Sequence, residues 1–259
     1  MSTTPAYPTS HRLLEGKSVL VTAAAGTGIG FATARRCAEE GARVVLSDVH
    51  ERRLSQAADE LEKLVGRRPA IVTCDVTVEE QVQRMVDVAI EAGDGIDVLV
   101  NNAGLGGTAA VVDMTDAQWG RVLDVTLTGT FRVTRAALRH MVPRGRGVIV
   151  NNASVLAWRA QAGQAHYAAA KAGVMALTRC AAIEAASAGV RVNAVAPSLA
   201  MHPFLAKVTT EETLRDLTAR EAFGRAAEPW EVANVIVFLA SEYSTYMTGE
   251  IVSVSSQRA

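Results

Sequence analysis

Short runs of Val, Ile and Leu alternate with longer, more polar stretches along most of this chain. Continuous apolar runs are typical of strands that are covered on both faces, as in parallel sheets. The intervening stretches have helical spacing, of which 31–40 and 51–65 are examples. The predicted strands are residues 18–22, 44–47, 70–74, 98–101, 148–151, 191–195 and 251–254. This alternation predicts a doubly wound α/β fold, a mostly parallel sheet with helices on both faces.

Two segments differ from this alternation. Residues 1–13 form a polar arm before the first strand. Residues 198–224 contain no predicted strand, only helical stretches of mixed charge that follow a strand end. Because long connections at strand carboxyl ends often bind or cover substrate, we expect a substrate lid there, with a solvated helical hairpin as the alternative. Since no linker or internal repeat interrupts the chain, residues 14–259 are predicted to form one domain.

The charge balance narrows the classes of partner. The chain of 259 residues carries 26 Lys and Arg against 27 Asp and Glu, a formal net charge of −1. Nucleic-acid-binding proteins usually have a basic surplus, so nucleic acid is not expected as the main partner. No apolar run approaches the roughly 20 residues that span a bilayer, and the N-terminal arm lacks the pattern of a signal peptide. We therefore expect a soluble, cytoplasmic protein without a membrane partner.

Three cysteines, Cys37, Cys74 and Cys180, lie far apart in the sequence. They form no CxxC pair, and no histidine stands near them at metal-ligand spacing. The sequence therefore predicts free thiols in a reducing compartment and no metal site.

A glycine-rich turn, Thr22 to Gly30, follows the first predicted strand and precedes a predicted helix. Small residues let the backbone approach a pyrophosphate, whose negative charge is favoured at a helix N-terminus. An ordinary tight turn is the alternative, but the position between strand and helix favours a dinucleotide site. The candidate cofactor contacts in this turn are Thr22, Ala24, Gly26, Thr27, Gly28 and Ile29.

Three more predicted strand ends add candidate cofactor contacts. Asp48 closes the second strand about 20 residues beyond the turn, where a carboxylate accepts hydrogen bonds from ribose hydroxyls. Because a carboxylate repels the extra phosphate of NADP, Asp48 favours NAD, while Arg52 and Arg53 leave NADP possible. An ordinary strand-end aspartate is the alternative. The other candidates are Asp75 and Val76 near the adenine, and Asn102, Ala103 and Gly104 near the ribose.

Tyr167 and Lys171 stand four residues apart in an Ala-rich stretch with strong helix propensity, which places both side chains on one helical face. A phenol has a pKa of about 10, and an adjacent ammonium favours the phenolate, so Tyr167 is a candidate general acid or base. Ser154 follows a predicted strand at the sheet edge where ligands bind, and its hydroxyl is a candidate for holding a substrate oxygen. A Tyr/Lys pair alone is more often surface decoration, but the three residues downstream of a dinucleotide turn favour catalysis.

Together these motifs resemble the short-chain dehydrogenase/reductase family. The resemblance rests on the turn from Thr22, the run Asn101-Asn102-Ala103-Gly104, Ser154 and Tyr167-x-x-x-Lys171, and covers residues 14–255. It implies a seven-stranded Rossmann sheet, hydride transfer to or from a nicotinamide, and frequent tetramers. It also implies that Tyr167, Lys171 and Pro197 contribute to the cofactor site, with Lys171 on the nicotinamide ribose.

Several positions depart from the family pattern, and two of the departures fall at the expected cofactor turn and catalytic residues. In the turn, Ala23 replaces the first glycine and one extra residue precedes Gly28, so the loop is expected to follow a modified path. Thr126 occupies the position of the family's fourth catalytic residue, an asparagine. Because threonine is shorter, the water relay to Lys171 that the family implies is expected to change.

Residues around the trio are candidates for substrate contacts. Trp158 and Arg159 follow the serine and are expected at the mouth of the site, where an aromatic face suits a bulky alicyclic substrate and Arg159 pairs with a phosphate or carboxylate. Lys207, Arg215 and Arg220 of the predicted lid are candidates for a CoA diphosphate. A packing Trp and a solvated charged helix are the alternatives.

Within the family, the stretches VTAAAGTGIG, NNASVLAWRA and GRAAEPWEVA resemble an actinobacterial subgroup labelled 3-oxoacyl reductase, which includes reduction of CoA esters from steroid C/D-ring degradation. This resemblance implies an NAD-dependent oxidoreductase acting on a secondary alcohol or ketone, with a CoA-linked alicyclic substrate. Two other functions stay open. One is NADPH-dependent reduction of 3-oxoacyl thioesters, and the other is dinucleotide binding without catalysis.

Overall fold

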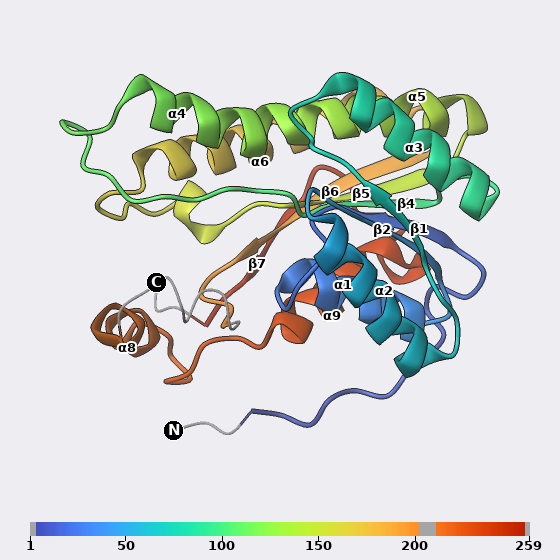
Figure 1. Ribbon diagram of the computed structural model, residues 1–259, viewed down its shortest axis with the longest axis horizontal. Coiled ribbons are helices and arrows are strands. Elements are labelled where there is room, and N and C mark those ends of the chain that lie inside the picture. The colour runs from blue at the N-terminus through green and yellow to red at the C-terminus, as the bar shows by residue number, and fades with distance from the viewer. Residues whose placement is uncertain (1–3, 202–210, 257–259) are drawn as a thin grey trace.

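The computed structural model describes residues 4–201 and 211–256, and its centre is a seven-stranded sheet (Figure 1). The spatial order is β3-β2-β1-β4-β5-β6-β7, and every neighbouring pair is parallel. The strands are β1 (Ser18–Val21), β2 (Arg43–Asp48), β3 (Ala70–Thr73), β4 (Val98–Asn101), β5 (Gly147–Asn152), β6 (Val190–Pro197) and β7 (Ile251–Val254). All seven predicted strands occur close to their predicted bounds, and the doubly wound sheet is confirmed.

Helices cover both faces of the sheet (Figure 1). One face carries α3, α5 and α6 with α4 beside them, and the other carries α1, α2 and α9. The bounds are α1 (Ile29–Glu39), α2 (Glu51–Val65), α3 (Glu79–Gly93), α4 (Asp116–Leu123), α5 (Gly129–Arg144), α6 (Ala165–Ala186), α8 (Glu211–Ala219) and α9 (Pro229–Ala240). Within the described ranges, no helix combines the length and hydropathy that crossing a bilayer requires.

The helical layers on both faces of the sheet explain why the strands appear in the sequence as runs of apolar residues. In β1, Val19 and Val21 pack in the core formed with α1, α2 and α9, whereas Leu20 packs in the core on the opposite face. All three side chains are 0% exposed. Successive strand residues point to opposite faces, so a strand covered on both faces has no solvent-facing side and does not alternate between apolar and polar residues.

The order of the strands reverses at β1, which lies between β2 and β4. The connection after β1 therefore runs to one side of the sheet, while β4 and the strands after it extend to the other. At such a reversal the connections diverge and leave a crevice at the carboxyl ends of the strands. The predicted cofactor residues after β1 and β4 lie at this crevice.

The N-terminal arm packs against the helical layer of α1 and α9. The Tyr7 hydroxyl donates a hydrogen bond to Glu39 at 2.8 Å, and the Tyr7 ring lies 5.3 Å from that of Trp230. The backbone amides of His11 and Leu13 donate to Glu40, the residue that follows α1. The described part of this arm is therefore held to α1, the helix that begins at the predicted cofactor turn.

The predicted lid is described in part. Helix α8 lies within it, and Arg215 and Arg220 are exposed there. Lys207, the third basic residue proposed for a CoA diphosphate, lies outside the described residues.

Candidate active site

The turn after β1 packs tightly against the start of α1. Ala23 has a φ of +49° and Gly26 a φ of +115°, so the backbone turns through conformations that most L residues avoid. A Cβ on Gly30 would lie 2.2 Å from the Ala23 carbonyl oxygen and 2.5 Å from Asn102 Nδ2, so only glycine fits there. A Cβ on Gly26 would meet nothing within 4 Å, which leaves the other side of the turn open.

The first turn of α1 supplies no negative charge to its own N-terminus. Its N-cap, Gly28, makes no side-chain hydrogen bond, and the first turn contains no acidic residue. By contrast, α2 begins with Glu51 and α3 with Glu79 in the first turn. Free amides and the helix dipole favour an anion at the end of α1. This end and the open turn fit the diphosphate of a dinucleotide.

Thr22 joins the carboxyl ends of β1 and β4. Its Oγ1 accepts hydrogen bonds from the amides of Asn102 at 2.9 Å and Ala103 at 3.1 Å. Asn102 Nδ2 in turn donates to the Ala23 carbonyl at 3.1 Å. The structure therefore brings the candidate residues of the two strand ends together and fixes them to each other.

Asp48 at the end of β2 holds the turn after β1. Its Oδ2 accepts a hydrogen bond from the Ala25 amide at 3.1 Å, and its Oδ1 accepts one from the His50 amide at 3.0 Å. Burial raises the pKa of Asp48 above its usual range, while the Ala25 amide and the charge of Arg53 oppose that rise. Asp48, the predicted partner of the cofactor ribose, therefore lies at the predicted cofactor turn and also helps to fix the shape of that turn.

Asp75 and Val76 occupy a more local setting after β3. Asp75 Oδ1 accepts hydrogen bonds from the Thr77 amide at 2.9 Å and the Thr77 hydroxyl at 2.7 Å. Val76 is buried, and a Cβ on Gly129 would lie 2.6 Å from its Cγ2. The Asp75 carboxylate therefore stabilises its own turn, at the edge of the crevice where adenine binding is predicted.

Tyr167 and Lys171 lie on the first turns of α6, on the same side of the helix. Lys171 Nζ lies 5.6 Å from the centre of the Tyr167 ring and donates a hydrogen bond to the Asn152 carbonyl at 2.5 Å. Lys171 is 3% exposed. A Cβ on Gly104 would lie 3.5 Å from Nζ, so the loop after β4 passes close to the ammonium. The helix, the end of β5 and this loop together position the lysine.

Ser154 completes the candidate trio. It is buried at the end of β5, where its Oγ accepts a hydrogen bond from the Leu156 amide at 3.2 Å. Burial raises the pKa of Tyr167, and a hydrogen bond with Ser154 opposes this rise. Ser154 and Tyr167 are therefore close enough to share one substrate oxygen.

The electrostatics of this pair differ from the sequence-based expectation. Lys171 was expected to lower the pKa of Tyr167, yet burial dominates and raises that pKa. The same burial lowers the pKa of Lys171 to about 8. The physical reason is that both groups share a low-dielectric site, which disfavours the charged form of each.

Thr126 lies in a π-helical turn, Asp124–Thr128, that interrupts the helix between α4 and α5. It is 0% exposed, and its Oγ1 accepts a hydrogen bond from the Leu105 amide at 2.9 Å and donates one to the Leu105 carbonyl at 3.0 Å. Both roles of the hydroxyl are therefore used on one residue of the loop beside Lys171. The π-helical turn that carries Thr126 is of a kind frequently found at functional sites. The Thr126 side chain fixes the loop after β4 at Leu105.

Two residues that contribute to the site were not among the predicted cofactor contacts. The sequence pattern marks Gly30 only as the last residue of the turn, whereas in the structure its missing Cβ lets α1 approach Ala23. Asn152 supplies the carbonyl that accepts from Lys171. One sequence signal pointed to it, because the run Asn-Asn-Ala occurs both at 101–103 and at 151–153.

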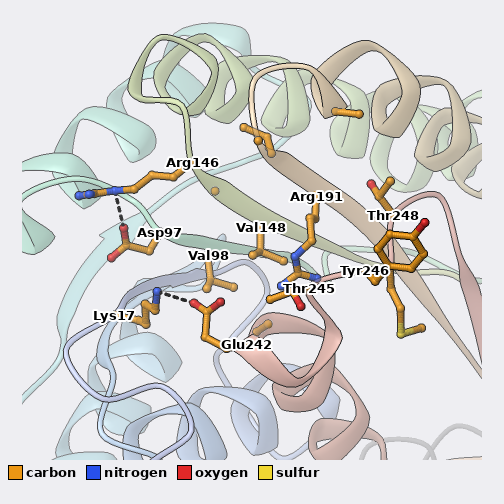
Figure 2. Close-up of a pocket in the computed structure, with 16 residues that line it drawn as sticks. Lys17, Asp97, Val98, Arg146, Val148, Arg191, Glu242, Thr245, Tyr246 and Thr248 are labelled. Carbon is orange, nitrogen blue, oxygen red and sulfur yellow. Dashed lines mark hydrogen bonds and ion pairs between the residues drawn. The ribbon is translucent and has the colours of Figure 1, made fainter.

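A separate cavity of about 560 Å³ lies at the opposite edge of the sheet (Figure 2). Its lining includes Val98, Gly147 and Val190, which are the first residues of β4, β5 and β6. Figure 2 shows the side chains of Lys17 and Arg146 pointing toward Glu242 and Asp97, respectively, with which they form ion pairs. The candidate active site lies at the carboxyl ends of the strands, away from this cavity.

Comparisons with known proteins agree with this geometry. The family model described as Enoyl-(Acyl carrier protein) reductase matches residues 23–256. Over 259 residues the chain is 62% identical to the (5R,7aS)-5-hydroxy-7a-methyl-1-oxo-2,3,5,6,7,7a-hexahydro-1H-indene-carboxyl-CoA reductase of Mycobacterium tuberculosis, covering 99% of this chain and 98% of that protein. It is 40% identical over 241 residues to the 3-oxoacyl-(acyl-carrier-protein) reductase FabG of Thermotoga maritima, covering 93% and 97%.

A solved structure shows the same fold. It is the crystal structure of a short chain dehydrogenase from Mycobacterium smegmatis, with a TM-score of 0.88, 59% identity and 99% coverage of both chains. The family model and these relatives extend over nearly the whole sheet and its crevice. The chain therefore belongs to the short-chain dehydrogenase/reductase family, whose members are oxidoreductases that use NAD or NADP.

Proposed function

We propose that this protein transfers a hydride between NAD(H) and a secondary alcohol or ketone of an alicyclic, steroid-ring-derived acid carried as its CoA thioester. The observation that carries the proposal is the 62% identity, over 99% of the chain, to a reductase whose name specifies such a compound. Two features of the site support it. The trio Ser154, Tyr167 and Lys171 is assembled at the crevice, and the turn after β1 fits a dinucleotide diphosphate.

The proposed chemistry divides between the trio and the cofactor. A bound nicotinamide supplies the hydride for ketone reduction or accepts it in alcohol oxidation. Ser154 donates a hydrogen bond to the substrate oxygen. Tyr167 gives that oxygen a proton during reduction and removes one during oxidation. Lys171, held on the Asn152 carbonyl, binds the nicotinamide ribose and places positive charge near the phenol.

The surroundings of the trio suit a bulky apolar substrate. Trp158, after the short helical turn that follows Ser154, is 49% exposed. Val111 and Val112 in the loop after β4 are also exposed. This loop meets the start of α6, since the Gln164 side chain donates to the Gly107 carbonyl at 2.8 Å. Exposed apolar side chains on loops at this edge offer contact area to an alicyclic ring.

A substrate panel tests the proposal. We expect bicyclic oxo- or hydroxyacyl-CoA esters to be converted with a higher kcat/KM than linear 3-oxoacyl thioesters on CoA or acyl carrier protein. Initial rates with NADH and NADPH, or their oxidised forms, measure this directly. A preference for linear thioesters with NADPH would favour 3-oxoacyl reduction instead. Dinucleotide binding without turnover on the whole panel would favour the non-catalytic alternative.

The cofactor preference is tested at Asp48. Replacing Asp48 with Ala is expected to lower the ratio of kcat/KM with NADH to that with NADPH by about 10- to 100-fold, because hydrogen bonds to a charged group are lost and repulsion of the 2′-phosphate ends. The ratio is the informative quantity, since the variant also releases the Ala25 amide and weakens both cofactors. Asp59→Ala, an exposed carboxylate of α2 paired with Arg68, is the control. An unchanged ratio in Asp48→Ala would refute NAD selection by this residue.

The role of Thr126 is tested by a matched pair of variants. Thr126→Val keeps the shape but removes the partner of both the amide and the carbonyl of Leu105 in a partly buried site. We expect a lower melting temperature, a stability loss of about 1–3 kcal/mol and a kcat reduced about tenfold. Thr126→Ser keeps the hydroxyl and should retain most of both. A wild-type-like Thr126→Val, or a Thr126→Ser as impaired as Thr126→Val, would contradict a role for the two hydrogen bonds to Leu105.

Self-association and location complete the proposal. We propose a homotetramer in the cytoplasm, taking part in lipid and steroid breakdown. Exposed apolar side chains on the layer of α4, α5 and α6 support association, namely Trp119, Phe131 and Ile183. We also propose that residues 14–259 act as one domain with a substrate lid at about 198–224.

A further inference from the structure

The same three residues, Asn-Asn-Ala, stand at the carboxyl ends of β4 and β5, as residues 101–103 and 151–153, and the two runs lie side by side. Asn101 and Asn151 are register partners in the parallel pair. Asn102 and Asn152 follow them directly. Because successive strand residues face opposite sides of a sheet, the first pair and the second pair serve different layers.

The first pair belongs to the layer of α5 and α6. Asn101 Nδ2 donates to Asn151 Oδ1 at 2.9 Å and to Thr134 of α5 at 3.0 Å. Asn151 Nδ2 donates to Thr178 of α6 at 2.9 Å. Both asparagines are buried. These hydrogen bonds join the pair to α5 and α6, so the pair fastens two helices to the sheet.

The second pair is directed toward the cofactor turn. Asn152 Nδ2 donates to Asn102 Oδ1 at 2.9 Å, and Asn102 Nδ2 donates to the Ala23 carbonyl at 3.1 Å. Ala23 is the non-glycine residue of positive φ in the turn. Two side-chain amides, linked by hydrogen bonds, therefore connect the end of β5 to the carbonyl of a residue whose backbone conformation is unfavourable.

Asn152 also contacts Lys171, through its backbone. Its carbonyl oxygen accepts the hydrogen bond from Nζ. Its side-chain oxygen, Oδ1, is buried and has no hydrogen-bond partner among the described residues. A buried acceptor without a partner is destabilising, and a valine would avoid that cost. Stability alone therefore does not account for an asparagine here, whereas a role for its Nδ2 does.

We infer that Asn152 is a positioning residue that, through Asn102, fixes the Ala23 carbonyl and the phosphate-binding turn relative to the strand end that holds Lys171. The inference rests on the proposed dinucleotide site. The two amides fix two parts of the proposed cofactor site relative to each other. These parts are the turn for the diphosphate and the lysine for the nicotinamide ribose. Asn102 orients the turn directly, and Asn152 orients Asn102.

The test is a double-mutant cycle on cofactor affinity. Dissociation constants for NADH and NADPH are measured by fluorescence titration for the wild type, Asn152→Val, Asn102→Ala and the double variant. Valine keeps the backbone carbonyl, so Lys171 retains its acceptor. We expect about five- to tenfold weaker binding in Asn152→Val, with kcat at saturating cofactor within about twofold of wild type. The double variant should bind no more weakly than Asn102→Ala alone, because Asn152 acts through Asn102.

Thr178→Val is the matched control, since it removes a partner of the first pair on the other face. It should lower the melting temperature and leave the cofactor dissociation constants unchanged. Wild-type affinity in Asn152→Val, additive losses in the double variant, or an equal loss in Thr178→Val would each overturn the inference. If Asn152→Val does not fold, Asn152→Ser is measured against the same expectations. Failure of the wild type to bind either dinucleotide would instead refute the proposed function.

Discussion

Replacing Tyr167 with Phe is expected to lower kcat by about 10²- to 10⁴-fold, the range that general acid–base catalysis contributes. Phenylalanine fills nearly the same volume on α6, so the helix and the contact with Lys171 should persist. The loss is specific to the hydroxyl, which is the only group of the ring able to give or accept the substrate's proton. Steady-state turnover at saturating cofactor and substrate measures it.

Two further measurements separate chemistry from folding in this variant. Cofactor affinity and melting temperature should remain close to the wild type, because the ring stays in place. Tyr243→Phe removes a phenol from an exposed side chain outside the site and should leave kcat unchanged. Near-normal turnover in Tyr167→Phe would contradict the proposed proton transfer by Tyr167.

Replacing Gly30 with Ala is expected to weaken cofactor binding by at least about tenfold and to destabilise the protein by about 1–3 kcal/mol, as overpacking does. Helix propensity alone predicts the opposite sign, since Ala is favoured over Gly by about 1 kcal/mol in a helix. The contact decides, because the new Cβ would stand 2.2 Å from the Ala23 carbonyl oxygen and 2.5 Å from Asn102 Nδ2. The first is a backbone atom and the second is a side-chain amide that donates a hydrogen bond to it, so neither can move away without opening the turn.

Gly120→Ala provides the matched comparison. Gly120 also lies inside a helix, α4, but a Cβ there would meet nothing within 4 Å. This substitution should raise stability by about 0.5–1 kcal/mol and leave cofactor affinity unchanged. Denaturant unfolding and cofactor titration of both variants give the comparison. A stabilised Gly30→Ala with unchanged affinity would contradict the close packing of α1 on the turn.

Much of the fold follows from local pattern. The seven apolar runs became the seven strands because each is long enough for one strand and is flanked by polar or glycine-containing turns. The i,i+4 spacing of Tyr167 and Lys171 likewise predicts a shared helical face, since it depends on helix geometry alone. Position 126 was harder to interpret. A threonine in place of an asparagine indicated a changed relay, but only the structure shows both ends of its hydroxyl bonded to Leu105.

The electrostatic expectation for Tyr167 was wrong in direction for a similar reason. Spacing on a helix shows that an ammonium is near a phenol, but not how much water surrounds them. In the structure Lys171 is buried, and its pKa falls to about 8 while the pKa of Tyr167 rises. The free enzyme therefore holds the proton on the phenol, and the ammonium loses its charge more readily than an exposed lysine would.

The sequence by itself predicted the order of strands and helices along the chain, and it also indicated the candidate dinucleotide turn and the candidate trio, because each depends on residues within one segment. The tertiary structure decided how these segments constrain one another. Asp48 holds Ala25, Thr126 holds Leu105 and Asn152 holds Asn102 over separations of 23, 21 and 50 residues. Such bonds depend on which strand ends meet at the crevice. Side-chain periodicity cannot specify that meeting, because the packing of both layers sets it.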